Sequence, residues 1–106
     1  MSDESNEKYN YKNYDSILNS PIRLAIMSLL LGSGEAEFTF IRDSIGATDG
    51  NLSRHLAKLE EEKLIEVRKE FEGKKPVTWQ KLTPEGKDAL YAYLAKLEKL
   101  IASVKK

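Results

Sequence analysis

Cysteine is absent from the 106-residue chain, and histidine occurs once. Without cysteine the chain can form no disulfide, no thiolate metal site and no thiol redox switch. One histidine cannot build a multi-histidine metal centre. The sequence therefore predicts no metal and no cofactor, and it excludes the sensors and enzymes that depend on such sites.

Long apolar runs are also missing. A membrane-spanning helix needs about 20 consecutive apolar residues, and no run in the chain approaches that length. The first ten residues, MSDESNEKYN, are acidic and polar, unlike a secretory signal. We therefore expect a cytoplasmic protein without a membrane partner.

A net charge of one sign is lacking as well. The 17 Lys and Arg residues balance the 17 Asp and Glu residues, so the formal net charge is zero. This balance argues against a wholly electrostatic nucleic-acid binder. The charges are unevenly distributed, however, because residues 73–82 contain three lysines and no acid. Any anionic partner is expected to meet this later part of the chain.

The remaining composition, 41% hydrophobic and 32% charged, is sufficient for one compact domain with a charged exterior. Residues 1–10 show no apolar periodicity, and we expect a flexible arm there. We assign residues 11–83 to the folded domain and residues 84–106 to a C-terminal helix.

Capping residues predict three helices in the first part of the chain. Ser20 precedes a proline at the first helical position, and Leu52, Leu56 and Leu59 form the apolar seam of the third helix. The predicted helices run from Pro21 to Gly32 or Gly34, from an N-cap at Thr39 to about Ile45, and from an N-cap at Thr48 or Asp49 to about Lys63.

Two β-rich runs and a long helix follow. LIEVRKEF and PVTWQKL flank the turn signal EGKK and predict a two-stranded hairpin. Thr83 and Pro84 then begin a helix that reaches Val104, a rod of roughly 31 Å. Apolar residues recur along it at spacings of four and three, the heptad pattern of a helix that pairs with a second helix. These predicted dimer-interface residues are Leu90, Leu94, Leu97, Ile101 and Val104.

The third helix has a polar face whose residue types suit DNA. Asn51 and Arg54 lie one turn apart near its start, and such side chains pair bidentately with adenine and guanine, respectively. Gly50 has no side chain and permits close approach of the backbone. We predict that these three residues read bases. The alternative is that this face is merely the solvated side of a structural helix.

Further polar residues are predicted to position the protein on DNA without reading its sequence. The predicted DNA-backbone contacts are Thr39, Thr48, Ser53, His55 and Lys58. The predicted contacts of the hairpin, which would act as a wing, are Arg68, Lys69, Gly73, Lys74 and Lys75. The alternative for the wing lysines is that they only increase solubility and block edge pairing of the hairpin.

Enzymatic and ligand-binding interpretations have weaker support. The sequence places no serine or carboxylate to complete a catalytic relay with His55, so no catalytic residue and no enzyme is predicted. Trp79, Tyr91 and Tyr93 could line a small-molecule pocket, but aromatic residues on a strand and a packed helix more often belong to the core. The pattern therefore does not support an effector.

The runs SPIRLAIMSLLL, FTFIRDSIGATDGNLSRHLAKLEEEKLIEV and KKPVTWQKLTPEGKDAL resemble stand-alone winged helix-turn-helix transcriptional regulators related to the MarR and ArsR groups. The resemblance covers about residues 15–103. It implies that the helix with Asn51 and Arg54 is the recognition helix, that the hairpin tip is the wing, and that the protein acts as a homodimer. Lys63 stands where relatives commonly have glycine. The cysteine and histidine motifs of metal-sensing ArsR members are absent, so metal sensing is not implied.

The expected fold is mainly α with a small β-hairpin: a winged helix-turn-helix with a long C-terminal dimerisation helix. The expected function is that of a homodimeric, sequence-specific double-stranded DNA-binding regulator of transcription. The alternative is a winged-helix protein-interaction module whose acidic patch, residues 60–62, faces a partner protein. Zero net charge keeps this alternative open.

Overall fold

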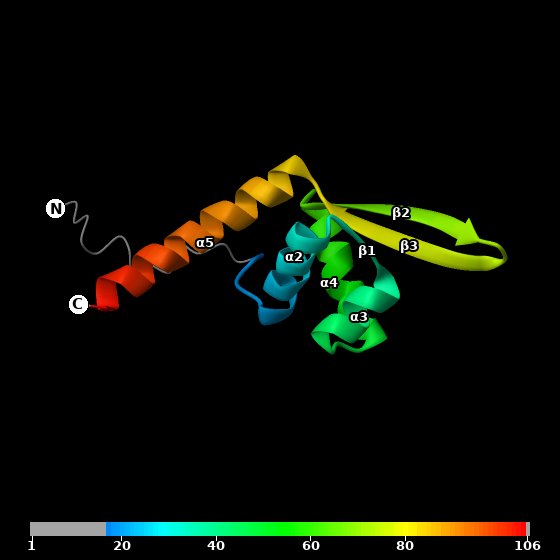
Figure 1. Ribbon diagram of the computed structural model, residues 1–106, viewed down its shortest axis with the longest axis horizontal. Helices are drawn as coiled ribbons and strands as arrows, with labels where there is room; N and C mark the ends of the chain where they lie inside the picture. Colours follow the sequence, from blue (N-terminus) through cyan, green and yellow to red (C-terminus); the bar gives the residue numbers. More distant parts are fainter. Residues whose placement is uncertain (1–16, 106) are drawn as a thin grey trace.

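The computed structural model describes residues 17–105 of the chain, and the predicted N-terminal arm lies outside them (Figure 1). Together these residues form an elongated body of 62 × 23 × 22 Å. The described elements are α2 (Pro21–Ser33), β1 (Glu35–Glu37), α3 (Phe38–Ile45), α4 (Asp49–Glu61), β2 (Ile65–Glu72), β3 (Lys75–Leu82) and α5 (Pro84–Val104).

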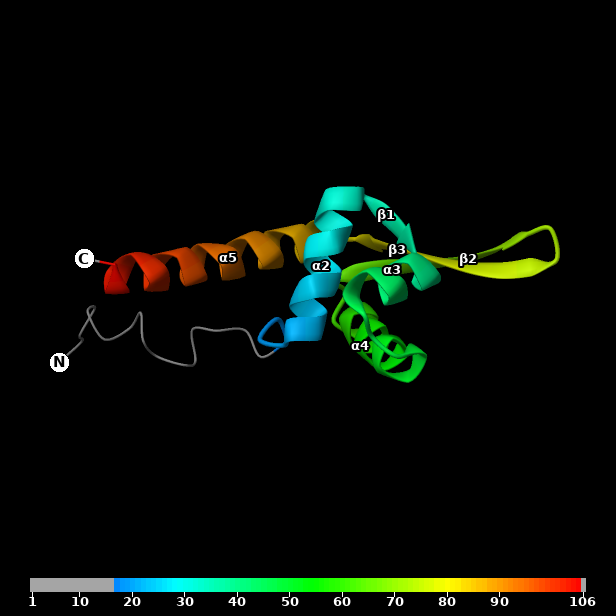
Figure 2. The same ribbon diagram turned by 60° about the horizontal axis from the view of Figure 1, so that its bottom comes forward.

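Helix α2 lies at the centre of the molecule and contributes most to the core. The Ser20 side chain caps it by accepting a hydrogen bond from the Arg23 amide at 3.3 Å, with Pro21 at the first position. Ile26, Met27 and Leu30 are completely or almost completely buried. Figure 2 shows α2 between α5 on one side and α3 and α4 on the other. The predicted cap and the end at Gly34 are both confirmed.

Helix α3 begins before the predicted cap. The N-cap residue is Glu37, whose side chain makes no capping hydrogen bond, and the helix starts at Phe38. The prediction of Thr39 as N-cap is wrong, because Thr39 lies in the first turn and its hydroxyl donates to the Glu37 carboxylate at 2.6 Å. Three residues, 46–48, separate α3 from α4, and the Thr48 side chain caps α4 as predicted.

The sheet has three antiparallel strands in the order β1-β3-β2, rather than the two predicted. Strand β1 is the sequence EAE, which has no β-branched or aromatic residue to mark it. It forms because Glu35 and Glu37 pair with Lys81 and Trp79 of β3. Beyond this three-stranded part, β2 and β3 continue as a two-stranded ribbon that projects from the body opposite to α5 (Figures 1 and 2). We call this ribbon, residues 69–78, the wing.

Helix α4 ends in a Schellman motif formed by a residue other than glycine. Lys63 has a φ of 62°, which is the left-handed conformation. Its amide donates to the Glu60 carbonyl at 2.9 Å, and the Leu64 amide donates to the Leu59 carbonyl at 2.9 Å. The chain thus reverses direction at Lys63, a position whose left-handed conformation favours glycine.

A compact junction connects this reversal to the start of α5. The Thr83 hydroxyl donates to the Lys63 carbonyl at 2.7 Å and accepts from the Gly86 amide at 2.9 Å. The Thr83 amide donates to the Leu64 carbonyl at 3.1 Å. A Cβ at Gly86 would lie 2.0 Å from that carbonyl oxygen, so only glycine fits. The LTPEG sequence is therefore explained by the close approach of two backbones. We call Lys63, Leu64, Thr83 and Gly86 the α4–α5 junction.

We expect Lys63→Gly to raise the free energy of unfolding by about 0.5–1 kcal/mol. A non-glycine residue in the left-handed region costs roughly 1–2 kcal/mol, part of which the flexibility of glycine in the unfolded chain offsets. Urea unfolding would measure the change. The matched control is Lys96→Gly in the exposed interior of α5, where the same substitution should destabilise by about 1 kcal/mol. Equal destabilisation by both substitutions would contradict the left-handed conformation of Lys63.

Candidate nucleic-acid interface

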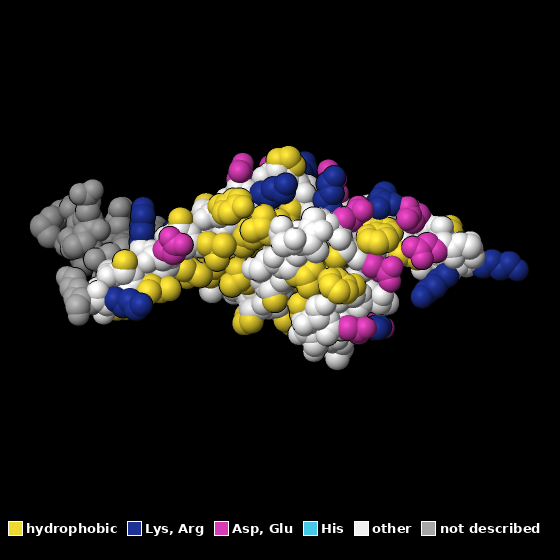
Figure 3. Space-filling view, in the orientation of Figure 1, with side chains coloured by type: hydrophobic (Ala, Val, Ile, Leu, Met, Phe, Trp, Pro, Cys, Tyr) yellow, Lys and Arg dark blue, Asp and Glu magenta, His cyan; other side chains and the backbone are white. Residues whose placement is uncertain are grey.

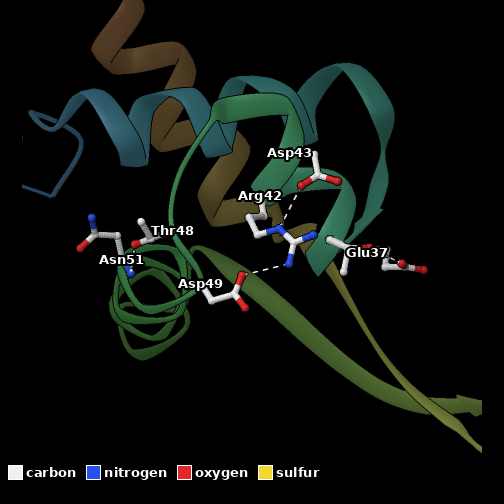
Figure 4. Close-up of polar contacts among 7 residues, drawn as sticks. Glu37, Arg42, Asp43, Thr48, Asp49 and Asn51 are labelled. Atoms are coloured by element: carbon white, nitrogen blue, oxygen red, sulfur yellow. Dashed lines mark hydrogen bonds and ion pairs between the residues drawn. The ribbon is translucent and has the colours of Figure 1, made fainter.

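Helix α4 buries one side and exposes the residues predicted to read bases. Leu52, Leu56 and Leu59 belong to the core, as their spacing predicts. The predicted base-reading residues Gly50, Asn51 and Arg54 are all exposed, as is Ser53. Thr48 and Asn51 lie together at the start of α4, where the Thr48 hydroxyl accepts from the Asn51 amide at 3.2 Å (Figure 4). The amino-terminal half of the helix therefore presents a polar, accessible surface.

Arg54 and Asn51 are coupled to each other. The Arg54 guanidinium donates from Nη2 to Asn51 Oδ1 at 3.1 Å. Within residues 17–105, no carboxylate forms an ion pair with Arg54. The pair thus combines a guanidinium with free donors and an amide, the two groups that best match guanine and adenine in the major groove.

An arginine of α3 holds the start of α4. Arg42 Nε donates to Asp43 Oδ1 at 2.9 Å, and Arg42 Nη1 donates to Asp49 Oδ1 at 3.0 Å (Figure 4). Hydrogen bonds from Arg42 to the two carboxylates raise its pKa. Asp49 is also the first residue of α4, where a negative charge favours the helix dipole. Exposed pairs of this kind contribute at most about 1 kcal/mol, so their effect is mainly on the geometry of the turn.

His55 is held from behind by α2. Arg23 Nη1 lies 3.0 Å from His55 Nδ1, and Arg23 Nε also donates to the Ile17 carbonyl. Since a guanidinium only donates, Nδ1 is the acceptor and the proton of the neutral ring is on Nε2. Burial lowers the pKa of His55, and the charges of Arg23 and Arg54 lower it further. Arg23 is not among the residues predicted from the sequence, although a cation in the first turn of an otherwise apolar helix is a signal that marks it.

Two of the predicted backbone contacts are engaged within the chain. Lys58 forms exposed ion pairs with Glu61 and Glu62, at 3.3 and 3.8 Å, across the last turn of α4. The Thr39 hydroxyl donates to Glu37. Pairs on a helix surface are worth about 0.3–0.5 kcal/mol, so a phosphate could displace them at small cost.

Strands β2 and β3 carry different charges on their two faces because alternate residues of a strand point to opposite sides. We call the face with Glu66, Arg68, Glu70 and Glu72 of β2 the outer face. Arg68 lies on the outer face, where it pairs with Glu35 at 2.9 Å and with Glu70, and its guanidinium lies 5.7 Å from the centre of the Trp79 ring. Trp79 Nε1 donates to Glu70 at 3.1 Å. The structure thus places Arg68 in a network that connects all three strands.

The other predicted wing residues are distributed over both faces and the tip. Lys69 lies on the opposite face from Arg68, and Lys75 stands across from Glu72 on the outer face. Gly73 has a φ of 65° and occupies the first position of the two-residue turn, with Lys74 at the second. Figure 3 shows basic side chains at the far end of the molecule, over the tip of the wing.

The predicted seam on α5 changes from buried to exposed along its length. Leu90 is completely buried in the core of its own chain, so its assignment to the dimer interface is wrong: it has no surface left for a partner. Leu94 and Leu97 are half-buried against the core, whereas Ile101 and Val104 are 52% and 69% exposed. Figure 3 shows hydrophobic side chains along α5 where it extends beyond α2.

The three aromatic residues considered for a ligand pocket lie apart. Tyr93 is buried and donates to Asn19 Oδ1 at 3.3 Å, and Trp79 belongs to the outer face of the sheet. Tyr91 is exposed at the edge of an open pocket of about 340 Å³. That pocket is lined by Leu30, Leu31, Gly34, Lys81, Leu82, Lys87 and Tyr91.

Within residues 17–105, no helix is long and apolar enough to cross a membrane. The same residues contain no group of three or more His, Asp or Glu side chains that could hold a metal ion.

We expect protonation of His55 to destabilise the fold. Because its pKa is lowered in the folded state, its contribution is complete above the unfolded value of about 6.5 and is lost as the pH falls towards the folded value. The free energy of unfolding should therefore decrease between pH 7 and pH 5. His55→Gln, which keeps an acceptor but does not titrate, should reduce this decrease. As the chain has one histidine, NMR titration of its imidazole measures the pKa directly; a midpoint above 6.5 would contradict this account.

Comparison with known proteins agrees with this geometry. A family model described as a winged helix DNA-binding domain matches residues 22–101. The chain is 34% identical over 88 residues to the uncharacterized protein MJ0432 of Methanocaldococcus jannaschii, covering 83% of this chain and 96% of that protein. It is similar to the transcriptional regulator homologue protein from Pyrococcus horikoshii OT3, with a TM-score of 0.82, 29% identity and coverage of 97% and 98% of the two chains.

A more distant structure shares the fold alone. ZitR of Lactococcus lactis, a zinc-responsive MarR family member, has a TM-score of 0.62 and 18% identity, and the match covers 84% of this chain and 60% of that one. Winged-helix domains that resemble transcriptional regulators in this way are typically non-enzymatic. The chain therefore belongs to the family of winged helix DNA-binding domains, and its structural neighbours are transcriptional regulators that include MarR family members.

Proposed function

We propose that this protein is a homodimeric, sequence-specific double-stranded DNA-binding regulator of transcription. One observation carries the proposal: the exposed Asn51–Arg54 pair at the amino-terminal half of α4, which has no carboxylate partner among the described residues. The similarity to the Pyrococcus horikoshii transcriptional regulator homologue supports it.

In the proposed complex, α4 enters the major groove with its first turns against the bases. Arg54 would donate to a guanine and Asn51 would pair with an adenine. A Cβ at Gly50 would meet no atom of the protein within 4 Å, so this position faces open space. Because Gly50 has no side chain there, the backbone of α4 would be able to approach the DNA closely. Exchanging the Arg54–Asn51 hydrogen bond for bonds to bases would keep both side chains satisfied.

The remaining polar residues would hold the phosphates on either side of the groove. Ser53 and the Nε2–H of His55 can donate from α4, and Thr48 lies at its start. Lys58 and Thr39 would first have to leave their carboxylate partners. On the wing, Lys69, Lys74 and Lys75 would extend the contact, while Arg68 would stay in its network with Glu35 and Glu70.

The dimer would form through the distal part of α5. Ile101 and Val104 expose apolar surface at heptad positions, and Leu94 and Leu97 continue the same stripe. Two recognition helices about 34 Å apart would meet successive major grooves. Doubling the number of phosphate contacts would compensate for the zero net charge of each chain.

Arg54→Ala should weaken binding to the preferred DNA sequence by about 1–3 kcal/mol per half-site and relax base preference at one position. The DNA would be selected from a random pool, and affinity measured by mobility shift over a salt titration. The control is Lys99→Ala, which also removes one exposed cation but lies on the side of α5 opposite the heptad stripe. If both variants bound with unchanged selectivity, Arg54 would have no role in reading bases.

The double variant Ile101→Glu, Val104→Glu should weaken dimerisation about 100-fold or more, because both carboxylates would enter an apolar interface. Analytical ultracentrifugation would measure the association, and circular dichroism would show that the winged domain remains folded. Lys99→Glu, on the opposite side of the helix, should leave the association unchanged. A variant that stayed fully dimeric would place the interface elsewhere.

A second function, that of a protein-interaction module, is favoured by a separate observation. Lys58 and Arg68 are both neutralised by carboxylates of the same chain, and Glu60–Glu62 form an exposed acidic patch at the end of α4. The two functions predict different behaviour at low ionic strength. A purified dimer without salt-dependent binding to mixed genomic DNA would favour the interaction module.

A further inference from the structure

The wing contains an aromatic side chain that is not packed in the core of the protein. Phe71 is 72% exposed, more than any other aromatic residue in residues 17–105. It lies on β2 opposite Pro76, one residue before the strand ends. A single exposed apolar residue is common on protein surfaces, so exposure alone assigns no role to it. Its surroundings on the ribbon are more informative.

The two faces of the wing differ in charge. Val67 packs on the core at the base of the ribbon, and Lys69 and Phe71 continue the same face beyond it. The residues of β3 on that face are Thr78, opposite Lys69, and Pro76. The carboxylates of β2 are all on the outer face: Glu66, Glu70 and Glu72. The face with Phe71 therefore carries a cation and no acid.

The position of the wing limits what could cover Phe71. The wing and α5 project from opposite sides of the body in both views (Figures 1 and 2). A second copy bound along α5 would therefore leave the wing uncovered. A duplex that received α4 in its major groove would instead present the adjacent minor groove about half a helical turn away, roughly 17 Å. The lysines of the wing face and tip, Lys69 and Lys74, are complementary in charge to such a polyanion.

We propose that Phe71 is a minor-groove contact that selects DNA by its deformability. The inference rests on the proposed function and extends it to the sequence that flanks the recognition site. Lys69 and Lys74 hold the phosphates on the two sides of the groove. The Phe71 ring packs on deoxyribose and the edge of a base step between them. Apolar side chains placed in this way partly unstack flexible steps such as TA, which bend more easily than G·C-rich sequence.

The test compares operators that differ only in their flanks. An operator selected by the wild-type dimer is prepared with TA-containing or G·C-rich flanks beneath the wing. We expect the wild type to prefer the TA flank by about tenfold, the size of one mismatched base pair. Phe71→Ala should lose this preference and keep discrimination within the core operator. Phe71→Leu, which keeps an apolar side chain, should retain most of it. Glu66→Gln, on the outer face, should behave as wild type.

Two further measurements separate the possible outcomes. Phe71→Ala should leave the thermal midpoint and the salt dependence of binding unchanged, since it removes no charge and no buried contact. A shallower salt dependence would show that the wing lysines had moved, and would overturn a direct apolar contact. If Phe71→Ala kept the flank preference, the inference would be wrong and the proposed function would stand. If the wild type bound no DNA selectively, both would be overturned.

Discussion

The α4–α5 junction is the constraint on which the arrangement of α4, the wing and α5 depends. Within four residues the chain ends α4, reverses at Lys63 and enters β2, and Thr83 binds both carbonyls of that reversal while it caps α5. Because Gly86 has no side chain, the first turn of α5 can rest on the Leu64 carbonyl. Helix α4, the wing and α5 thus all extend from this one hydrogen-bonded junction. In the proposed dimer, a change in the direction of α5 would alter the spacing of the two α4 helices without altering either of them.

Zero net charge is compatible with DNA binding because the charges are segregated. Carboxylates neutralise Lys58 and Arg68 at the end of α4 and on the outer face of the sheet, whereas Arg54 and Lys69 form no ion pair with any carboxylate of residues 17–105. Arg42 shows a third use of charge, since its two carboxylate partners, Asp43 in α3 and Asp49 at the start of α4, lie on either side of the turn between the two helices. Counting charges along the sequence could not distinguish these three uses. The carboxylates that the fold places next to each cation are what separates them.

Most elements followed from local signals. Ser20, Thr48 and Thr83 cap helices as predicted, and the leucine spacing identified the buried side of α4. The errors arose where a tertiary partner overrides the local signal. Thr39 is a favourable cap, but pairing of β1 with β3 places the N-cap two residues earlier, at Glu37, and the Thr39 hydroxyl donates to the Glu37 carboxylate. Leu90 fits the heptad, but its position over α2 buries it in its own core.

The sequence by itself determined the helices, the hairpin, the polar face of α4 and the absence of thiol chemistry, because spacing, caps and composition act over a few residues. Only the tertiary structure decided which cations are neutralised, that Arg23 supports His55, that β1 completes the sheet, and where along α5 the core ends. These features join residues such as Arg23 and His55, or Glu35 and Arg68, that are more than 30 positions apart. Their contacts arise from the packing of whole elements, which no local pattern encodes.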